Sequence, residues 1–352
     1  MKAQGGVVFE HVTKRYGDVA AVDDVSFEVH PATLVTLLGP SGCGKTTTLR
    51  MVAGLEAATA GRIFIGGNDV TRRAANERDV SMVFQSYALF PHMNVLDNVC
   101  YGPLSMNMPR EKARELAHAK LAMLGLAGLE SRLPSELSGG QQQRVAVARS
   151  LVLEPAVLLF DEPLSNLDAK LRRRVRQEIR ELQQSLELTV LYVTHDQEEA
   201  LAVSDQVIVM DRGRIAQQGT PAELYEAPRS RFLADFIGDA NLVSGQLVRG
   251  SAGAQFESGD VSLPVRANGV AAGPATLAVR PHRLRLTAAG EGMLPAECLR
   301  AAYLGSRVEY VLGTPWGELL VFDDDVRAPI ARGARAGVSF APDDVIVIPG
   351  TA

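Results

Sequence analysis

Four short apolar runs constrain the fold of this 352-residue chain more than any other feature of its sequence. The runs are continuous rather than alternating, which is typical of strands covered on both faces of a parallel sheet; they occupy residues 33–38, 79–84, 156–160 and 188–194. Between the last two runs, apolar residues recur at helical spacing, at Leu171, Val175, Ile179, Leu182 and Leu186. A strand, a helix and a strand in this order predict a right-handed crossover and a doubly wound α/β core.

The character of the sequence changes after about Phe236, where glycine, alanine and proline become more frequent. Apolar residues there alternate with polar ones, as in half-buried strands. Val308, Tyr310 and Leu312 share one face of such a strand, and residues 313–317 predict a hairpin loop. With about 150 residues per domain as a guide, we expect an α/β domain, a helical subdomain within it, and an all-β domain, over residues 1–235, about 87–151, and 236–352.

The composition is that of an ordinary globular protein, with 22% charged and 46% hydrophobic residues. A net charge of -5 argues against a nucleic-acid partner, because such binders carry a broad basic surface. The widely spaced Cys43, Cys100 and Cys298 form no CxxC pair, which favours a reducing compartment over a disulfide framework or a zinc site. Neither a signal peptide nor an apolar run of about 20 residues is evident, so we expect a protein that is soluble or held at a membrane by a partner.

Residues 39–46, GPSGCGKT, fit the pattern G-x-x-x-x-G-K-[ST] between the first apolar run and a helix. In this context, the backbone N–H groups of the loop and of the helix N-terminus surround a β-phosphate. Lys45 adds positive charge at the β and γ oxygens, and Thr46 is placed to ligate Mg²⁺. The alternative is a glycine turn that binds nothing. We expect a nucleotide-binding loop formed by Gly39, Pro40, Ser41, Gly42, Cys43, Gly44, Lys45, Thr46 and Thr47.

The other three apolar runs each end at polar side chains suited to phosphate chemistry. Gln85 follows the second run, Asp161 and Glu162 close the third, and His195 follows the fourth. Ligands of open α/β sheets bind at the carboxyl ends of the strands, so these side chains are predicted to meet. We expect Asp161 to ligate Mg²⁺, directly or through water, and Glu162 to be the general base for the attacking water. His195 would contact the γ-phosphate and hold Glu162, and Gln85 would reach Mg²⁺ or the water. Taken singly, the acid pair fits an ordinary loop equally well, and a lone glutamine or histidine fits a solvated loop residue better, but their shared position at strand ends favours the site.

A second glycine-containing helix start lies at residues 138–141, SGGQ, with no lysine beside it. Ser138 and Gln141 fit a capping box, which explains the segment as an ordinary capped helix. The alternative is an anion site made by the Ser138 hydroxyl and the N–H groups of Gly139 and Gly140. Since the Lys45 loop already holds the phosphates of one nucleotide, a second device predicts a two-fold dimer. Each copy would then complete the γ-phosphate site of the other.

These motifs together make the chain similar to the nucleotide-binding subunits of ATP-binding cassette (ABC) transporters, over about residues 7–235. GPSGCGKTT resembles Walker A, VLLFDEP resembles Walker B, and LSGGQQQR resembles the family signature. Gln85, His195 and SNLDAK match the Q-, H- and D-loops. Tyr16 matches the aromatic residue that stacks on adenine, although an ordinary edge-strand tyrosine is an alternative.

The resemblance implies a P-loop NTPase core with a helical subdomain, and ATP and Mg²⁺ as cofactors. It also implies a head-to-tail homodimer with two ATP molecules at the interface, and a role for Asp168 across that interface. The segment 85–98, QSYALFPHMNVLDN, is rich in apolar and aromatic groups that suit a groove for a helix of a membrane subunit. Ordinary packing of the helical subdomain is the alternative.

The C-terminal region resembles the OB-like TOBE domain of importers for polyamines, ferric iron, sulfate, maltose and related sugars. SRFLADFIGDANLV, at the junction, is closer to the iron and polyamine branch. The resemblance implies a peripheral ATPase subunit on the cytoplasmic face of the bacterial inner (plasma) membrane. Its partners would be two transmembrane permease subunits and, indirectly, a periplasmic or extracellular substrate-binding protein. We expect ferric iron or polyamine as the solute, with a sugar, glycerol phosphate, sulfate or phosphonate as the alternative.

Two functions of other classes compete with this interpretation. A soluble ABC ATPase acting on nucleic acid or ribosomes would carry long coiled-coil insertions, tandem cassettes or basic arms, and the sequence contains none of these. A regulatory module, in which the β domain senses a ligand and the ATPase is secondary, would lose regulation but keep transport when residues 239–352 are deleted.

Overall fold

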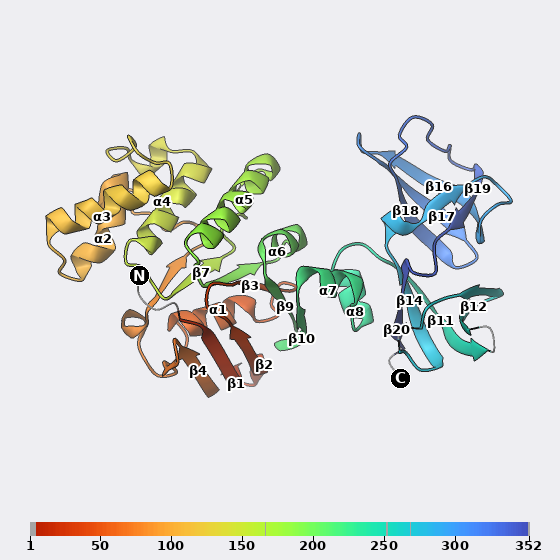
Figure 1. The fold of residues 1–352 in the computed structure, drawn as a ribbon, viewed down its shortest axis with the longest axis horizontal. Helices are drawn as coiled ribbons and strands as arrows, with labels where there is room; N and C mark the ends of the chain where they lie inside the picture. Colours follow the sequence, from red (N-terminus) through yellow and green to blue (C-terminus); the bar gives the residue numbers. More distant parts are fainter. Residues whose placement is uncertain (1–4, 166, 251–252, 268, 351–352) are drawn as a thin grey trace. The chain divides into compact units, whose positions relative to one another are not determined.

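The computed structural model describes residues 5–165, 167–250, 253–267 and 269–350. The chain divides into two compact units, Met1–Pro221 (unit 1) and Ala222–Ala352 (unit 2), both drawn in Figure 1. Unit 1 contains the four apolar runs, and unit 2 contains the alternating strands. Within the described ranges, no helix is long and apolar enough to cross a membrane.

A six-stranded sheet forms the centre of unit 1. Its order is β10-β9-β3-β8-β7-β6, and its neighbouring strands are parallel except for the antiparallel pair β10 and β9. Every residue of β3, β7 and β8 is buried, which confirms that three of the four continuous apolar runs are strands covered on both faces. The strand of the other run, β6, lies at the edge of the sheet, and three of its four residues are only partly buried. The six strands are β3 (Leu34–Leu38), β6 (Val80–Val83), β7 (Val157–Asp161), β8 (Val190–Thr194), β9 (Gln206–Asp211) and β10 (Arg214–Gly219).

The two faces of this sheet bury different layers. One face packs against α1 (Lys45–Ala53) and an antiparallel sheet of order β2-β1-β4-β5. The other face packs against α4 (Gly139–Leu151) and α5 (Ala169–Ser185), which carries the predicted apolar stripe. Helices α1 and α4 therefore lie in separate layers, on opposite faces of the sheet. The remaining elements are β1 (Val7–Tyr16), β2 (Val19–Val29), β4 (Ala60–Ile65), β5 (Asn68–Asp69), the 3-10 turn η1 (Ala75–Glu77) and α6 (Gln197–Val203).

Three helices form a cluster with its own core in the region predicted to be a helical subdomain. They are α2 (Val95–Ser105), α3 (Arg110–Met123) and α4, with the 3-10 turn η2 (Pro134–Glu136) before α4. Figure 1 shows them side by side in orange to yellow-green. The side-chain amide of Asn98 is fully buried. It accepts a hydrogen bond from the Phe90 N–H and donates one to the Phe90 carbonyl oxygen, which fixes the loop before α2.

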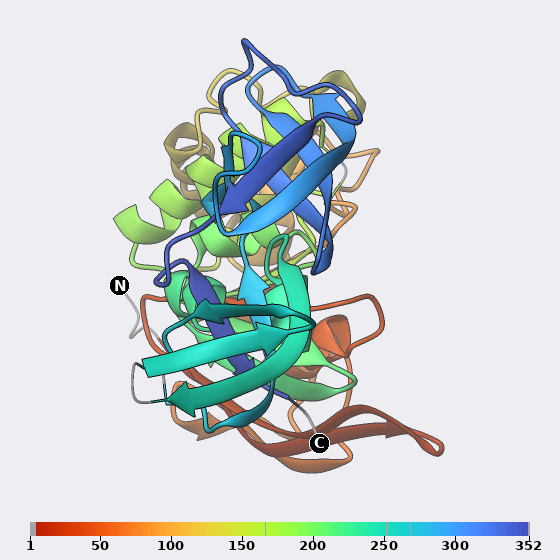
Figure 2. The same cartoon turned by 90° about the vertical axis from the view of Figure 1, so that its right-hand side faces the viewer.

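Unit 2 combines two short helices with two antiparallel five-stranded sheets, seen in Figure 2. The orders are β13-β12-β11-β14-β20 and β15-β19-β16-β17-β18, and both sheets contribute to one core. Thr314 pairs with Gly317, so the predicted hairpin loop is confirmed. The elements are α7 (Pro221–Glu226), α8 (Arg231–Phe236), β11 (Asn241–Gly250), β12 (Gly253–Ser258), β13 (Val261–Pro264), β14 (Gly273–Val279), η3 (Pro281–Arg283), β15 (Arg285–Thr287), β16 (Leu294–Tyr303), β17 (Val308–Thr314), β18 (Gly317–Asp323), β19 (Arg335–Ser339) and β20 (Val345–Pro349).

The division between the units falls after Pro221, whereas the sequence suggested a division after residue 235. The difference arises because the buried side chain of Arg280, just after β14, holds α7 and α8. Its guanidinium donates to the carbonyl oxygens of Ala234 at 2.9 Å and Tyr225 at 2.9 Å, and lies 4.2 Å from the Tyr225 ring centroid. Burial of a guanidinium is costly unless its N–H groups donate, and these carbonyls accept from Nη1 and Nη2 and so tie both helices to unit 2, although the buried Nε has no hydrogen-bond partner among the described residues.

Candidate active site

The glycine loop between β3 and α1 has a backbone that most residues would not tolerate. Gly42 and Gly44 have φ of 80° and 105°, and a Cβ on Gly44 would lie 2.4 Å from the carbonyl oxygen of Ala21. Gly44 is also the N-cap of α1, so the helix begins without a side-chain cap and without an acidic residue in its first turn. The first-turn N–H groups of α1 therefore suit an anion, as the sequence predicted.

Lys45 places its ammonium inside this loop. The side chain is buried, and Nζ donates to the carbonyl oxygens of Gly39 at 2.6 Å and Pro40 at 2.9 Å. Nζ also lies 3.7 Å from Sγ of Cys43. Burial raises the pKa of the Cys43 thiol more than Lys45 lowers it, so the thiol stays neutral. The lysine charge is thus set among neutral groups, an arrangement that favours a bound anion.

Asp161 ends β7 beside the first turn of α1. The Thr46 hydroxyl donates to Oδ1 of Asp161 at 3.5 Å. Burial raises the pKa of Asp161, Arg50 lowers it in part, and Glu162 raises it further. Among the described residues no three His, Cys, Asp or Glu side chains group as a metal site. The hydroxyl and carboxylate oxygens nevertheless match the ligand preference of Mg²⁺, which typically takes one or two protein ligands and completes its shell with phosphates and water.

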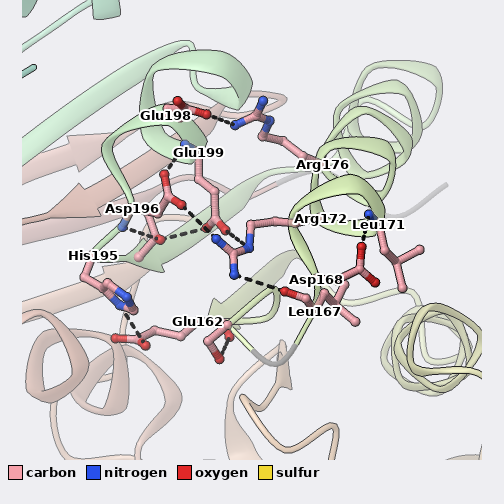
Figure 3. Close-up of polar contacts among 12 residues, drawn as sticks. Glu162, Leu167, Asp168, Leu171, Arg172, Arg176, His195, Asp196, Glu198 and Glu199 are labelled. Carbon is pink, nitrogen blue, oxygen red and sulfur yellow. Dashed lines mark hydrogen bonds and ion pairs between the residues drawn. The ribbon is translucent and has the colours of Figure 1, made fainter. Parts of the chain in front are cut away.

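Glu162 and His195 meet at the ends of neighbouring strands, as Figure 3 shows. Nδ1 of His195 lies 3.0 Å from Oε2 of Glu162. A carboxylate can only accept, so Nδ1 carries the proton of this bond. Glu162 has a φ of 45°, an uncommon value for a residue with a side chain. Its N–H donates to the carbonyl oxygen of Val193. The sequence therefore correctly placed this acid and this imidazole together.

Gln85 reaches the same loop through Ser165, the first residue of the predicted D-loop segment SNLDAK. Its Nε2 donates to Oγ of Ser165 at 3.1 Å, and that hydroxyl donates to the carbonyl oxygen of Glu162 at 3.1 Å. Gln85 is thus two hydrogen bonds from the Glu162 backbone. The D-loop motif contains Ser165 but assigned no role to it, because a serine three residues after an acid is common in turns.

The start of α4 is closed by its own side chains. Oε1 of Gln141 accepts from the Ser138 N–H at 2.9 Å, and Oγ of Ser138 accepts from the Gln141 N–H at 3.4 Å. This is the predicted capping box. Gly139 faces Leu167, before α5, and Gly140 faces α5 itself, where a Cβ on Gly140 would lie 3.2 Å from Cδ1 of Leu171. No hydrogen bond among the described residues joins Ser138 to the Lys45 loop, and α1 and α4 lie in different layers (Figure 1).

Tyr16 and Asp168 occupy simple structural positions within one copy. Tyr16 ends β1 with 49% of its surface exposed, and the Lys14 ammonium lies 4.7 Å from its ring centroid. Asp168 is the N-cap of α5, and its Oδ1 accepts from the Leu171 N–H at 2.9 Å. Asn166, within the predicted D-loop, lies outside the described residues. Adenine stacking and contact across a dimer therefore stay predictions.

A second polar network behind Glu162 and His195 was not predicted at all. It centres on Arg172 of α5 and Glu199 of α6, which lie close together in Figure 3. Glu199 is buried, and burial raises the pKa of its carboxyl. Arg172 had been expected only on the polar face of an amphipathic helix. Its partners come from distant parts of the sequence, so no local pattern reveals them.

Fold and site together define a nucleotide-binding α/β protein of the phosphate-loop type, and comparison with known proteins narrows this class. Residues 22–165 match the ABC transporter family, and residues 277–348 match the TOBE domain. The Fe(3+) ions import ATP-binding protein FbpC 1 of Rhizobium meliloti (strain 1021) is 57% identical over 349 residues, which is 99% of each chain. The Fe(3+) ions import ATP-binding protein FbpC of Agrobacterium fabrum is 59% identical over 330 residues, or 92% of each chain.

Two solved structures share the fold of unit 1. The cbiO1 protein of Clostridium perfringens, part of the cbiONQ ABC transporter complex, has a TM-score of 0.58 and 29% identity, covering 62% of this chain and 89% of its own. MJ0796, a bacterial ABC transporter cassette solved as a dimer, has a TM-score of 0.54 and 30% identity, covering 61% and 98%. The chain therefore belongs to the ATP-binding subunits of ABC transporters, ATPases coupled to transport, and carries a C-terminal TOBE domain.

Proposed function

We propose that this chain hydrolyses Mg-ATP as a homodimer and thereby drives uptake of ferric iron through two transmembrane permease subunits. The proposal places it on the cytoplasmic face of the bacterial plasma membrane, with a substrate-binding protein delivering iron from outside. One observation carries it: the Lys45 loop, Asp161 and the Glu162–His195 pair stand at the carboxyl ends of adjacent strands β3, β7 and β8. The names of relatives that are 54% to 59% identical support iron as the solute.

The chemistry follows from the positions of these groups. The Lys45 ammonium and the α1 N–H groups bind the β and γ oxygens of ATP. Thr46 and Asp161 would hold Mg²⁺, which when bound neutralises charge on the phosphate oxygens. Glu162 takes a proton from the attacking water onto a carboxylate oxygen, and His195 keeps this carboxylate in place through its Nδ1–H.

A second copy of the chain completes each site in this proposal. Ser138 and the following glycines begin α4, on a different layer from α1 in the same copy. A two-fold dimer would bring the helix start of one copy to the γ-phosphate held by the other. The α4 N-terminus then contributes N–H groups and the positive end of its dipole. Asp168 and its loop would face the sister copy at the same place.

A groove near Gln85 supports the coupling part of the proposal. A cavity of about 420 Å³ is lined by aromatic and small residues, among them Phe84, Phe90 and Tyr101. Arg149 of α4 fixes its wall by donating to the carbonyl oxygens of Tyr87 and Ala88. An apolar groove fixed to a helix of the cluster suits a helix of a permease subunit. Movement of that helix would reach Gln85, and through Ser165 the Glu162 loop.

Glu162→Gln tests the hydrolytic mechanism. We expect ATP binding to be kept, turnover to fall by about 10²–10⁴-fold because the base is lost, and an ATP-bound dimer to accumulate. Phosphate release and gel filtration with ATP measure these effects. Glu154→Gln is the matched control, because Glu154 precedes β7, has a similar φ of 50° and pairs with Lys120. Turnover near wild type in Glu162→Gln rejects Glu162 as the base.

The substrate is tested in cells that lack the chromosomal copy of this chain. Uptake of radiolabelled ferric iron should be lost and restored by wild-type protein, but not by Glu162→Gln. Uptake of labelled putrescine, measured in parallel, should be unchanged. Loss of putrescine uptake with normal iron uptake would move the assignment to polyamines, with the ATPase mechanism intact.

A further inference from the structure

Arg172 stands at the centre of the second polar network shown in Figure 3. It lies in the first turn of α5, directly after the loop 164–168. Its Nη2 donates to the carbonyl oxygen of Leu167 at 3.0 Å, and its Nη1 lies 3.3 Å from Oδ2 of Asp196. Its Nε is 3.9 Å from Oε1 of Glu199. One guanidinium thus joins the D-loop, the residue after His195, and helix α6.

Asp196 fixes the backbone on the far side of His195. Its N–H donates to Oγ1 of Thr194 at 3.0 Å, and its Oδ1 accepts from the Glu199 N–H at 3.0 Å. Thr194 in turn donates to the buried Glu199 carboxyl at 2.7 Å. The residues before and after His195 are therefore both held by one network, to which Arg172 supplies the positive charge.

His195 has little else to set its direction. Its side chain is 58% exposed, and the described hydrogen bonds of its ring are limited to the one with Glu162. A cavity of about 80 Å³ lies between this pair and the network, lined by residues of both, including Ser165 and Arg172. Side chains beside a cavity receive little packing support, so the imidazole direction depends on its backbone.

We propose that Arg172 is a positioning residue that couples the Leu167 carbonyl to His195 through Asp196. The proposal rests on the proposed function, in which the neighbouring Asp168 faces the sister copy. Docking of the sister copy fixes the Leu167 carbonyl, the Arg172 guanidinium then holds Asp196 in place, and Asp196 keeps His195 on Glu162. Hydrolysis in one site then depends on arrival of the partner even before the γ-phosphate contacts are complete.

The same two helices supply a matched control pair. Arg176, one turn further along α5, lies 3.8 Å from Glu198 of α6. Glu198 is 88% exposed, and this pair contacts neither Leu167 nor Asp196. Arg176→Ala removes a charge between α5 and α6 without touching the proposed route.

The test compares steady-state ATP hydrolysis by the full-length chain carrying Arg172→Ala or Arg176→Ala. We expect Arg172→Ala to lower kcat about tenfold, roughly the value of one charged hydrogen bond, with KM for ATP within about twofold of wild type. Arg176→Ala should stay within about twofold of wild type in both. If either variant lost turnover only because it was less stable, its loss in kcat would be accompanied by a lower melting temperature. We therefore measure the melting temperature of both variants beside kcat.

Two further variants keep the test decisive if Arg172→Ala folds poorly. Arg172→Lys keeps the charge but cannot span Leu167 and Asp196 together, so it should fold and still lose several-fold in kcat. Adding Arg172→Ala to Asp196→Asn should cost no more than about twofold beyond Asp196→Asn alone. Full turnover in Arg172→Lys, or multiplicative losses in the double variant, would overturn the role of Arg172. Neither result bears on Glu162, whose own variant tests the proposed function separately.

Discussion

Two helices of unit 1, α1 and α4, begin at glycines, and their N-termini are built differently. At α1, Gly44 is the N-cap with a left-handed backbone, and no side chain caps the helix. At α4, Ser138 and Gln141 close a reciprocal capping box. The first start leaves its N–H groups to a ligand, whereas the second satisfies the N–H groups of Ser138 and Gln141 internally. Glycine therefore serves a turn conformation at α1 and close helix packing at α4.

In our proposal only the α1 start binds phosphate within a single copy, and the difference between the two helix starts supports this. The Lys45 loop combines uncapped N–H groups with a buried ammonium. The α4 start has no lysine, and its hydroxyl already accepts a hydrogen bond from Gln141. In the proposed dimer the Ser138 hydroxyl, which is exposed, is free to donate its own proton to a γ-phosphate oxygen while it still caps α4. Capping and ligand binding are then compatible roles of one serine.

The strongest test of this comparison is Ser138→Arg, from which we expect the largest loss of turnover. Bulk at the α4 start should prevent closure of two copies and lower turnover by about 10²-fold or more, because a misplaced partner loses transition-state geometry. Nucleotide binding by single copies, measured with a fluorescent ATP analogue, should be unchanged. Ser138→Thr, which keeps a capping hydroxyl, is the control. Unchanged turnover in Ser138→Arg would leave the capping box as the sole role of Ser138.

A smaller effect, on the free energy of unfolding, distinguishes the glycine of the α1 turn from the glycine packed against α5. Gly44→Ala puts a Cβ 2.4 Å from a backbone oxygen at a left-handed φ, so we expect a loss of about 2 kcal/mol in unfolding free energy together with nucleotide affinity. Gly140→Ala meets only the end of a leucine side chain, at 3.2 Å, and has an ordinary helical backbone. It should change unfolding free energy by less than about 1 kcal/mol. Urea denaturation of both variants compares them, and equal losses would contradict the distinction.

The smallest effect concerns stability at Asp161. Burial raises the pKa of this carboxyl, so the folded state releases its proton at a higher pH than the unfolded state does. Stability due to this group is therefore lost as pH rises above the unfolded pKa of about 4. Asp161→Asn should raise the melting temperature by about 2 °C at pH 7.5 and by less at pH 5, while turnover falls. A lower melting temperature at pH 7.5 would contradict a cost of burying the charge.

The positions of the candidate catalytic side chains followed from the sequence because strand ends are local features. Four continuous apolar runs gave four strands; Asp161, Glu162 and His195 came directly at strand ends, and Gln85 came two residues after the end of β6. A parallel sheet brings such ends to one edge whatever the loops do. The Lys45 loop was predictable for the same reason, since a glycine pattern between a strand and a helix has few conformations.

The long-range polar contacts were not predictable in this way. Arg172 looked like a solvated residue on an amphipathic helix, yet it bonds Asp196, which lies far along the chain. Arg280 follows a strand of the β domain, yet its guanidinium holds α7 and α8, which precede that domain in the predicted division. In both cases one guanidinium satisfies several oxygens that only the folded chain brings together. The spacing of hydrophobic residues along the sequence carries no information about such contacts.

The most direct test of the account is the turnover per chain as a function of chain concentration. Each site in our proposal needs two copies, so phosphate release per chain should fall steeply below the concentration at which sedimentation with ATP shows dimers. The fall should coincide with dissociation of the Glu162→Gln dimer. Constant turnover per chain at concentrations where only single copies sediment would show that one chain hydrolyses ATP alone, and would contradict the shared site.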